Sequence, residues 1–349
     1  MAVSIKDIAR LAGVSHSTVS RALRDSPLIP EPTAQRIKQI AADLSYSASA
    51  VGRSLVTRKT ETIGVVVTSI DDPFNGEVVA GIEEVANGYG YSVILATSQA
   101  DPEREMRVVR SFGERRVDGI LVASSRLGAN YLTLLSELHV PVVLLNNQHP
   151  SDFVYSIAID NVDGGYQAAQ HLIELGHRKI AYIGDQSGLQ SDAERRSGFK
   201  KALRKAGLAA PAEYITRGDG RTSGGRNCAQ QLLTLPDRPT AIFCYNDMTA
   251  LGAMEAAAEQ NLVVGRDLSI VGFDDLFFAS FLQPPLTTIR QPKKELGRRA
   301  TELLITLLKG GQAERTVVMK GELIARGSST TQGDYQSISS GKNSATSSW

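Results

Sequence analysis

Near the start of the chain, residues 14–23 (VSHSTVSRAL) combine small hydroxyl side chains, one histidine and one arginine, with little apolar surface. In a helix, Val19 and Ala22 would face a core. The side chains left to face outward would be His16, Ser17, Ser20 and Arg21. Arginine is the commonest side chain that reads guanine in the major groove, and histidine and serine make short hydrogen bonds. The stretch therefore predicts a helix that reads DNA.

The spacing of Ala9, Gly13 and Val19 is typical of a helix-turn-helix. A small alanine lets the second helix approach the first, glycine adopts the left-handed turn, and valine packs the second helix onto the first. Ser4 and Ser15 are placed to cap these two helices. A third amphipathic helix is expected shortly before residue 46.

The formal net charge of +1 is distributed unevenly along the chain. Residues 1–59 carry nine Lys and Arg against four Asp and Glu, a charge of +5, and the remainder carries −4. A small basic head on a slightly acidic body favours a polyanion as the partner of the head alone.

From Thr62 onward, apolar strand-like runs alternate with helical stretches. The runs are TIGVVVTS, YSVILATS, DGILVASS, PVVLLNN, RKIAYIGD, TAIFCYND and DLSIVGFDD. Strands that are apolar on both faces predict parallel sheets covered by helices on both sides. Their number and spacing favour two similar α/β lobes, and the late helix 293–309 implies that the chain crosses between the lobes more than once.

Polar side chains follow several of these strand-like runs. In open α/β sheets ligands bind beyond the carboxyl ends of the strands. The positions at these ends include Asp71, Asp72, Pro73, Phe74, Ser124, Ser125, Arg126, Asn146, Asn246, Asp247, Asp274 and Asp275. Carboxylates, amides and an arginine (Arg195, at the start of a helix) can hold neighbouring hydroxyls in paired hydrogen bonds. Of these, Asp247 is interpreted as a helix cap.

Several classes of function lack support in the sequence. The two cysteines are expected to be small core residues, and the scattered histidines have no metal-ligand spacing. We expect no metal, no cofactor and no catalytic residues. The N-terminus lacks a long apolar run, so we expect a cytoplasmic protein with no membrane partner.

Seven stretches resemble the lactose/galactose repressor (LacI) family of bacterial transcription regulators in order and spacing. They are IKDIARLAGVSHSTVSRAL, RIKQIAADLSY, GRSLVTRKTETIGVVV, HLIELGHRKIAYIGD, AIFCYNDMTALGAMEAA, DLSIVGFDD and PPLTTIRQPKKELGRRA. The resemblance covers roughly residues 3–331. It implies a body of two lobes like a periplasmic binding protein, which dimerises and binds a small effector in the cleft.

The sequence pattern and the resemblance together predict five parts. The expected parts are a head at 1–46, a hinge helix or linker at 47–60, a first lobe at 61–160 with about 292–319, a second lobe at 161–291 with about 320–332, and a tail at 333–349, which is expected to be disordered because it is Ser/Gly-rich and lacks periodicity.

Hinge contacts to DNA are also implied by the resemblance, since the family inserts a leucine into the minor groove. Leu55 matches that leucine. The expected DNA contacts are Ser4, Ser15, His16, Ser17, Thr18, Ser20, Arg21, Ser49, Arg53 and Leu55. The family's usual Tyr-x-Pro-Asn is replaced here by residues 46–49 (YSAS), which removes a helix-start restraint.

The effector contacts expected from the strand ends and the resemblance are Phe74, Ser124, Asn146, Arg195, Asn246, Asp274 and Gln291. Two residues depart from sugar-responsive members. Asn146 stands where many have Asp, and Gly220 stands where several have an aromatic residue. Because Arg126 and Arg221 could bind an anion, an acidic or phosphorylated ligand remains an alternative to a neutral sugar.

We therefore expect a homodimeric repressor of sugar-metabolism genes that binds a two-fold symmetric double-stranded DNA operator. A sugar or sugar derivative would control it allosterically. The body alone would also suit a solute-binding transport component, and a sugar-modifying enzyme is a third possibility.

Overall fold

The computed structural model describes residues 3–46, 59–123, 138, 140–146 and 155–332. It divides into two compact units, Met1–Thr60 and Glu61–Trp349. The first unit is called the head and the second the body.

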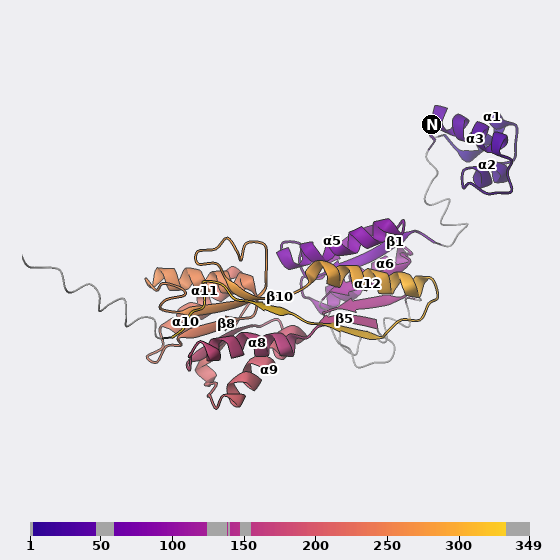
Figure 1. The fold of residues 1–349 in the computed structure, drawn as a ribbon. Coiled ribbons are helices and arrows are strands. Elements are labelled where there is room, and N and C mark those ends of the chain that lie inside the picture. The colour runs from indigo at the N-terminus through magenta and orange to yellow at the C-terminus, as the bar shows by residue number, and fades with distance from the viewer. Residues whose placement is uncertain (1–2, 47–58, 124–137, 139, 147–154, 333–349) are drawn as a thin grey trace, which may run out of the picture. The chain divides into compact units, whose positions relative to one another are not determined.

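Three helices form the head (Figure 1): α1 (Ile5–Ala12), α2 (His16–Ala22) and α3 (Glu31–Asp43). Their shared core includes Ile8, Val19, Ala22 and Ile37, all fully buried. Gly13 ends α1 with a left-handed φ of 63°, the conformation that glycine adopts without strain.

Caps fix the ends of the head helices. The Ser15 hydroxyl accepts a hydrogen bond from the Thr18 amide at 3.1 Å and so caps α2. At the start of α1, the Ser4 amide donates to the Asp7 carboxylate at 3.0 Å. Helix α3 begins at Glu31 with Pro32 in its first turn, where a missing amide hydrogen costs nothing.

The body holds two sheets of six strands each, among the residues described. The first sheet has the order β11-β5-β4-β3-β1-β2 and is parallel throughout. Its strands are β1 (Thr62–Val67), β2 (Ser92–Thr97), β3 (Gly119–Ala123), β4 (Val142–Leu145), β5 (Tyr155–Ile159) and β11 (Thr316–Met319).

The second sheet has the order β12-β10-β9-β8-β6-β7 and is parallel except for β12, which runs antiparallel to β10. Its strands are β6 (Ile180–Asp185), β7 (Ile215–Gly218), β8 (Ala241–Cys244), β9 (Ser269–Asp274), β10 (Thr287–Arg290) and β12 (Glu322–Ile324).

Helices pack on both sheets (Figure 1). The first sheet carries α5 (Pro73–Gly88), α6 (Pro102–Glu114) and α12 (Lys293–Leu308), and the second carries α8 (Asn161–Glu174), α9 (Gln190–Lys205), α10 (Thr222–Leu233) and α11 (Asp247–Glu259). A short 3-10 helix, Ala212–Tyr214, precedes β7. We call the two halves the first and the second lobe.

The chain passes between the lobes at three points, after β5, after β10 and after β11. This confirms the predicted fold class of a helical head and a two-lobed parallel α/β body. Five strands, β5, β7, β10, β11 and β12, were not among the seven predicted runs. Three of them, β7, β11 and β12, are short and partly exposed at sheet edges, so their apolar signal is weak. The other two, β5 and β10, are mostly buried.

None of the helices in the described residues is long and apolar enough to cross a membrane.

Candidate functional site

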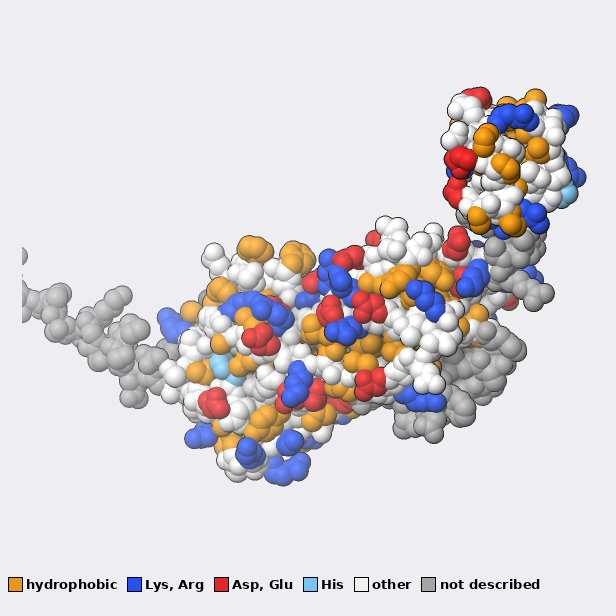
Figure 2. All heavy atoms as spheres, turned by 45° about the vertical axis from the view of Figure 1, so that its right-hand side comes forward, with side chains coloured by type: hydrophobic (Ala, Val, Ile, Leu, Met, Phe, Trp, Pro, Cys, Tyr) orange, Lys and Arg blue, Asp and Glu red, His pale blue; other side chains and the backbone are white. Residues whose placement is uncertain are grey.

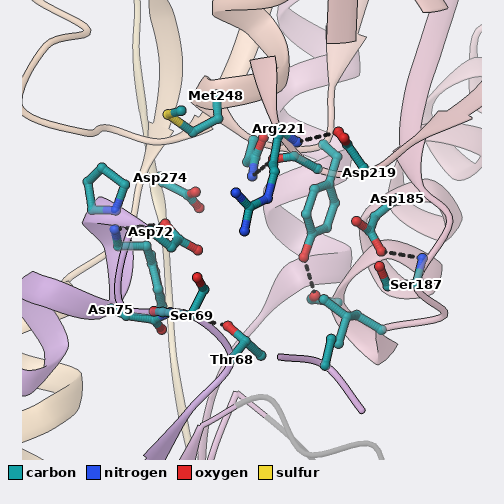
Figure 3. A pocket seen from close by; sticks show the side chains of 18 of the residues that line it. Thr68, Ser69, Asp72, Asn75, Asp185, Ser187, Asp219, Arg221, Met248 and Asp274 are labelled. Carbon is teal, nitrogen blue, oxygen red and sulfur yellow. Dashed lines mark hydrogen bonds between the residues drawn. The ribbon is translucent and has the colours of Figure 1, made fainter. Parts of the chain in front are cut away.

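A cavity of about 750 Å³ lies between the two lobes of the body, at the carboxyl ends of strands from both sheets. The first lobe supplies residues that follow β1, β2 and β4, and the second supplies residues that end or follow β6, β7, β8, β9 and β10. Figure 3 shows the carboxylates of Asp72 and Asp274 directed into the same part of the cavity, from the start of α5 and from β9. The size suits a small-molecule ligand.

Arg195 is held rigidly in the wall of this cavity. It lies in the second turn of α9, and its guanidinium is 3.6 Å from the centre of the Phe273 ring and 4.7 Å from that of Tyr245. It donates to the Asn161 side chain at 3.0 Å and to the Tyr245 carbonyl at 2.6 Å. These contacts leave its Nη2 facing Asp274 Oδ1 at 3.8 Å. Arg195 is therefore a fixed cation beside a buried carboxylate.

Two carboxyl groups of the cavity, those of Asp274 and Asp72, have a raised pKa. Burial raises the pKa of Asp274 to about 7, against the lowering effect of Arg195, and Asp72 raises it further. Burial also raises the pKa of Asp72, although its carboxylate accepts a hydrogen bond from the Phe74 amide. Burial is thus the main cause of the raised pKa of both carboxyl groups.

Two amide oxygens of the cavity lining, Asn146 Oδ1 and Gln291 Oε1, are buried without a hydrogen-bond partner among the described residues. The Gln291 amide donates to Asp274 Oδ1 at 2.5 Å, which fixes the orientation of its oxygen. A buried polar atom without a partner is costly. Both oxygens are thus unsatisfied acceptors within the wall of the cavity.

Asn246 serves the fold as well as the cavity. Its side chain caps α11 by accepting from the Thr249 amide at 2.8 Å, and it donates to the Gly220 carbonyl at 2.9 Å. Its amide therefore holds the turn around Gly220 against the start of α11.

The interpretation of Asp247 as the cap of α11 was wrong. Since Asn246 takes that position, Asp247 is the first residue of the helix and fully buried. Its carboxylate accepts from the Leu276 amide at 2.7 Å and from the Thr288 hydroxyl at 2.6 Å. It thus fixes the segment that follows β9.

Six of the seven expected effector contacts line the one cavity. They are Phe74, Asn146, Arg195, Asn246, Asp274 and Gln291. Ser124 lies outside the described residues, as do Ser125 and Arg126. The contact of these six with an effector stays a prediction.

The predicted set of contacts left out other lining residues, among them Asp72, Asp185, Asp219 and Tyr245. Asp72 was among the strand-end positions but not among the expected contacts. The strand-end rule could also have included Asp185, which ends β6, and Tyr245, which directly follows β8. The Tyr245 hydroxyl is 2.9 Å from that of Ser191, which links β8 to α9.

On the head, α2 separates a buried from an exposed face as predicted. Val19 and Ala22 are fully buried, whereas His16, Ser17 and Arg21 are exposed. Figure 2 shows further basic side chains on the surface of the head.

The hydroxyls at the start of α2 bind one another, since Ser15 Oγ lies 2.7 Å from Ser17 Oγ and 2.8 Å from Thr18 Oγ1. Ser20 is half-buried. Three of the expected DNA contacts, Ser49, Arg53 and Leu55, lie outside the described residues, and DNA contact by all ten stays a prediction.

Two other findings bear on the chemistry. Cys228 and Cys244 are buried and free of disulfides, and burial raises the pKa of both thiols. Within the described ranges, no group of three or more His, Cys, Asp or Glu side chains is arranged to hold a metal ion.

Comparisons with known proteins match both units. Residues 4–49 match the model of "Bacterial regulatory proteins, lacI family", and residues 169–329 match a "Periplasmic binding protein-like domain". The HTH-type transcriptional repressor PurR of Photobacterium profundum is 37% identical over 325 residues, which are 93% of this chain and 97% of that protein.

Two solved structures are similar over nearly the whole chain. The lac repressor dimer bound to operator and the anti-inducer ONPF has a TM-score of 0.87 and 28% identity, covering 95% of this chain and 100% of that one. The complex of the transcriptional regulator CelR with cellobiose has a TM-score of 0.72 and 29% identity, covering 93% and 99%. The similar proteins are regulators rather than enzymes. The chain therefore belongs to the lacI family of bacterial regulatory proteins, and its class is that of a DNA-binding transcriptional repressor.

Proposed function

We propose that the chain is a cytoplasmic homodimer that binds a two-fold symmetric DNA operator through its head and responds to a neutral, hydroxyl-rich effector, a sugar or sugar derivative. The observation that carries the effector class is the surplus of hydrogen-bond acceptors in the cavity of the body.

The described lining of the cavity holds five aspartates but only two arginines. Arg195 already donates to protein acceptors, and Arg221 donates to Asp71 at 2.8 Å. A phosphate or carboxylate group on a ligand is itself an acceptor, so it has no hydrogen bonds to donate to these aspartates. A polyhydroxylated ligand can donate hydrogen bonds to these carboxylates.

Phe74 supplies an apolar wall to the same cavity, where it is 8% exposed. A sugar ring presents an apolar face between its hydroxyls, and this wall could pack against it. The similar CelR structure holds cellobiose. That complex supports a carbohydrate for this chain.

The effector class can be tested by thermal shift of the full-length protein with sugars, their phosphates, nucleosides and nucleobases. A ligand that binds the folded state raises Tm in proportion to its occupancy. We expect a neutral sugar to stabilise the body and its phosphate to do so far less. Stabilisation by a phosphorylated compound, a nucleoside or a nucleobase alone would contradict the proposal.

The role of the head can be tested at Arg21. Selection from random duplexes would give an operator, and Arg21→Ala should then lower the ratio of operator to random-DNA affinity by about 10- to 100-fold. Arg10→Ala is the matched control, because Arg10 is also exposed on the head but pairs with Asp7. It should weaken both affinities alike. An unchanged ratio in Arg21→Ala would refute the assignment.

A homodimer accords with apolar side chains that the body leaves exposed. Phe277 is 69% exposed and Phe281 80%, both in the segment after β9. Large exposed aromatic groups mark interaction surfaces. The similar lac repressor structure is a dimer on operator. We expect dimer contacts from this segment and also from residues 76–86 of the first lobe. Sedimentation of Phe281→Ser tests the contribution of the segment after β9, because loss of the aromatic side chain should weaken the dimer.

A further inference from the structure

We infer that Lys293 is a positioning residue that couples the effector cavity to the relative position of the two lobes, a role that rests on the function proposed above. Lys293 is the first residue of α12 and is only 4% exposed. Its Nζ donates to the carbonyl oxygens of Asp274 and Asp275, each at 2.7 Å, and lies 3.3 Å from Glu77 Oε1.

These contacts join the two lobes through a single buried ammonium group. Helix α12 belongs to the first lobe, where Leu296 and Leu304 pack in one core with Ile63 of β1. The carbonyls of Asp274 and Asp275 belong to the second lobe, at the end of β9. A change in the relative position of the lobes must therefore stretch or re-form the hydrogen bonds of Lys293.

Asp274 takes part in both the cavity and this junction. Its carboxylate lies in the cavity lining and accepts from Gln291, whereas its carbonyl accepts from Lys293. The φ angles of Asp274 and Asp275 are 114° and 51°, which side-chain-bearing residues rarely adopt. A ligand that binds the Asp274 carboxylate therefore contacts a strained turn. The carbonyl oxygens of the same turn accept hydrogen bonds from Lys293.

The first lobe can transmit such a movement because α12 and α5 are locked together. A Cβ at Gly81 would lie 2.1 Å from the Lys294 carbonyl oxygen, and one at Gly297 would lie 2.1 Å from that of Val78. The two backbones are thus in direct contact, and Figure 1 shows the helices side by side. Helix α5 starts beside the cavity, where Asp72 caps it. Lys293 and the α5–α12 pair therefore connect cavity residues of both lobes.

A buried lysine contributes little net stability, because the cost of desolvating its charge offsets much of the favourable energy of its contacts. Lys294, the next residue, provides a contrast. It is exposed and pairs with Glu84 of α5, inside the first lobe. Lys294 carries the same charge and lies on the same helix, but its ion pair with Glu84 does not join the two lobes. It is therefore the matched control.

The first test measures the lobe-to-lobe distance in full-length protein without added ligand. Spin labels are attached to p-acetylphenylalanine introduced at two exposed positions, Arg107 of α6 and Lys200 of α9. When labelled chains are diluted with unlabelled ones, the labels report one distance between the lobes of each chain. We expect Lys293→Met to broaden the distance distribution about twofold, because the lobes lose the hydrogen bonds that Lys293 makes between them. Lys294→Met should reproduce the wild-type distribution. A Lys293→Met distribution that superimposes on wild type would overturn the inference.

If Lys293→Met does not fold, Lys293→Gln keeps the inference testable, because its shorter side chain cannot keep both hydrogen bonds that Nζ donates to the Asp274 and Asp275 carbonyls. It should also broaden the distribution, and an unchanged distribution would then overturn the inference.

The second test adds D-ribose, D-glucose or cellobiose. A sugar that raises the Tm of wild type should also shift its lobe distance. Lys293→Met should keep the Tm rise but lose the shift, which a merely structural role would not predict. Retention of the full shift would overturn the inference. If none of the sugars raises the wild-type Tm, the sugar proposal fails, and the ligand-free distances still decide the role of Lys293.

Discussion

Arg221 Nη1 donates to Asp71 Oδ2 at 2.8 Å, and this ion pair bridges the rim of the cavity between the two lobes. Asp71 follows β1 of the first sheet, and Arg221 follows β7 of the second. Figure 3 shows Arg221 reaching toward the side of the cavity where Asp72 and Asp274 lie. The pair is exposed, with side chains 60% and 59% accessible, so it can open without a large loss of stability.

We expect Arg221→Ala to increase the dissociation rate of the effector several-fold, because it removes a contact that holds the lobes together. Exposed pairs contribute roughly 0.2–1 kcal/mol, so the change in affinity should stay below about fivefold and shrink at high salt. Stopped-flow release measures it. Arg226→Ala is the control, since Arg226 pairs with Glu259 within the second lobe, and equal rates in both variants would exclude a role for the rim pair.

Effector affinity should rise with pH through neutrality. Burial holds the pKa of Asp274 at about 7, and the ionised carboxylate is the better acceptor for effector hydroxyls. Since the ionised fraction grows about tenfold between pH 6 and pH 8, the dissociation constant should fall by about that factor. Calorimetry in buffers of different ionisation heats would also detect proton release. Asp274→Asn should flatten the profile, and a flat wild-type profile would contradict the prediction.

The same carboxyl makes the ligand-free body less stable as pH rises. In the unfolded chain it ionises near 3.8, whereas the folded state retains the proton to about 7. Between these values the folded state binds more protons than the unfolded state, so the free energy of unfolding falls with increasing pH. We expect the wild-type Tm to decline more than that of Asp274→Asn over this range. Parallel profiles would show that other groups dominate.

Loss of the cap on α2 should loosen the DNA-reading helix. Ser15→Ala removes the hydroxyl that accepts from the Thr18 amide, which costs about 1 kcal/mol. Faster hydrogen exchange at residues 16–22 of the full chain measures it. Ser17→Ala is the control, because Ser17 binds the Ser15 hydroxyl but caps nothing, and equal exchange in the two variants would refute the capping role.

A side chain at Gly220 should weaken effector binding as well as strain the backbone. Its φ is 72°, and a Cβ would lie 2.7 Å from Asp185 Oδ2 in the cavity wall. Gly90 has a φ of 77° with open space around it, so Gly90→Ala carries only the backbone strain. Gly220→Ala should lose similar stability and, in addition, weaken effector binding in a titration. Unchanged binding in both variants would show that Asp185 can move freely.

The sequence located the cavity because strand ends are readable from apolar runs. Asp274 and Asn146 follow such runs directly, and the structure brings both to the same cavity. The roles of single side chains were harder to predict. Asn246 and Asp247 are adjacent polar residues at a helix start, and only backbone geometry decides which one caps the helix. Lys293 gave no signal, since its contacts with Asp274 and Asp275 join residues that only the crossing of the chain brings together.

The three passages between the lobes also constrain how the gene can change. Strands β11 and β12 are consecutive in the chain but complete opposite sheets, each at an edge. Neither lobe is a contiguous block of sequence, so recombination at one point cannot exchange a lobe intact. A stop codon shortly before residue 316 would remove an edge strand from both lobes at once.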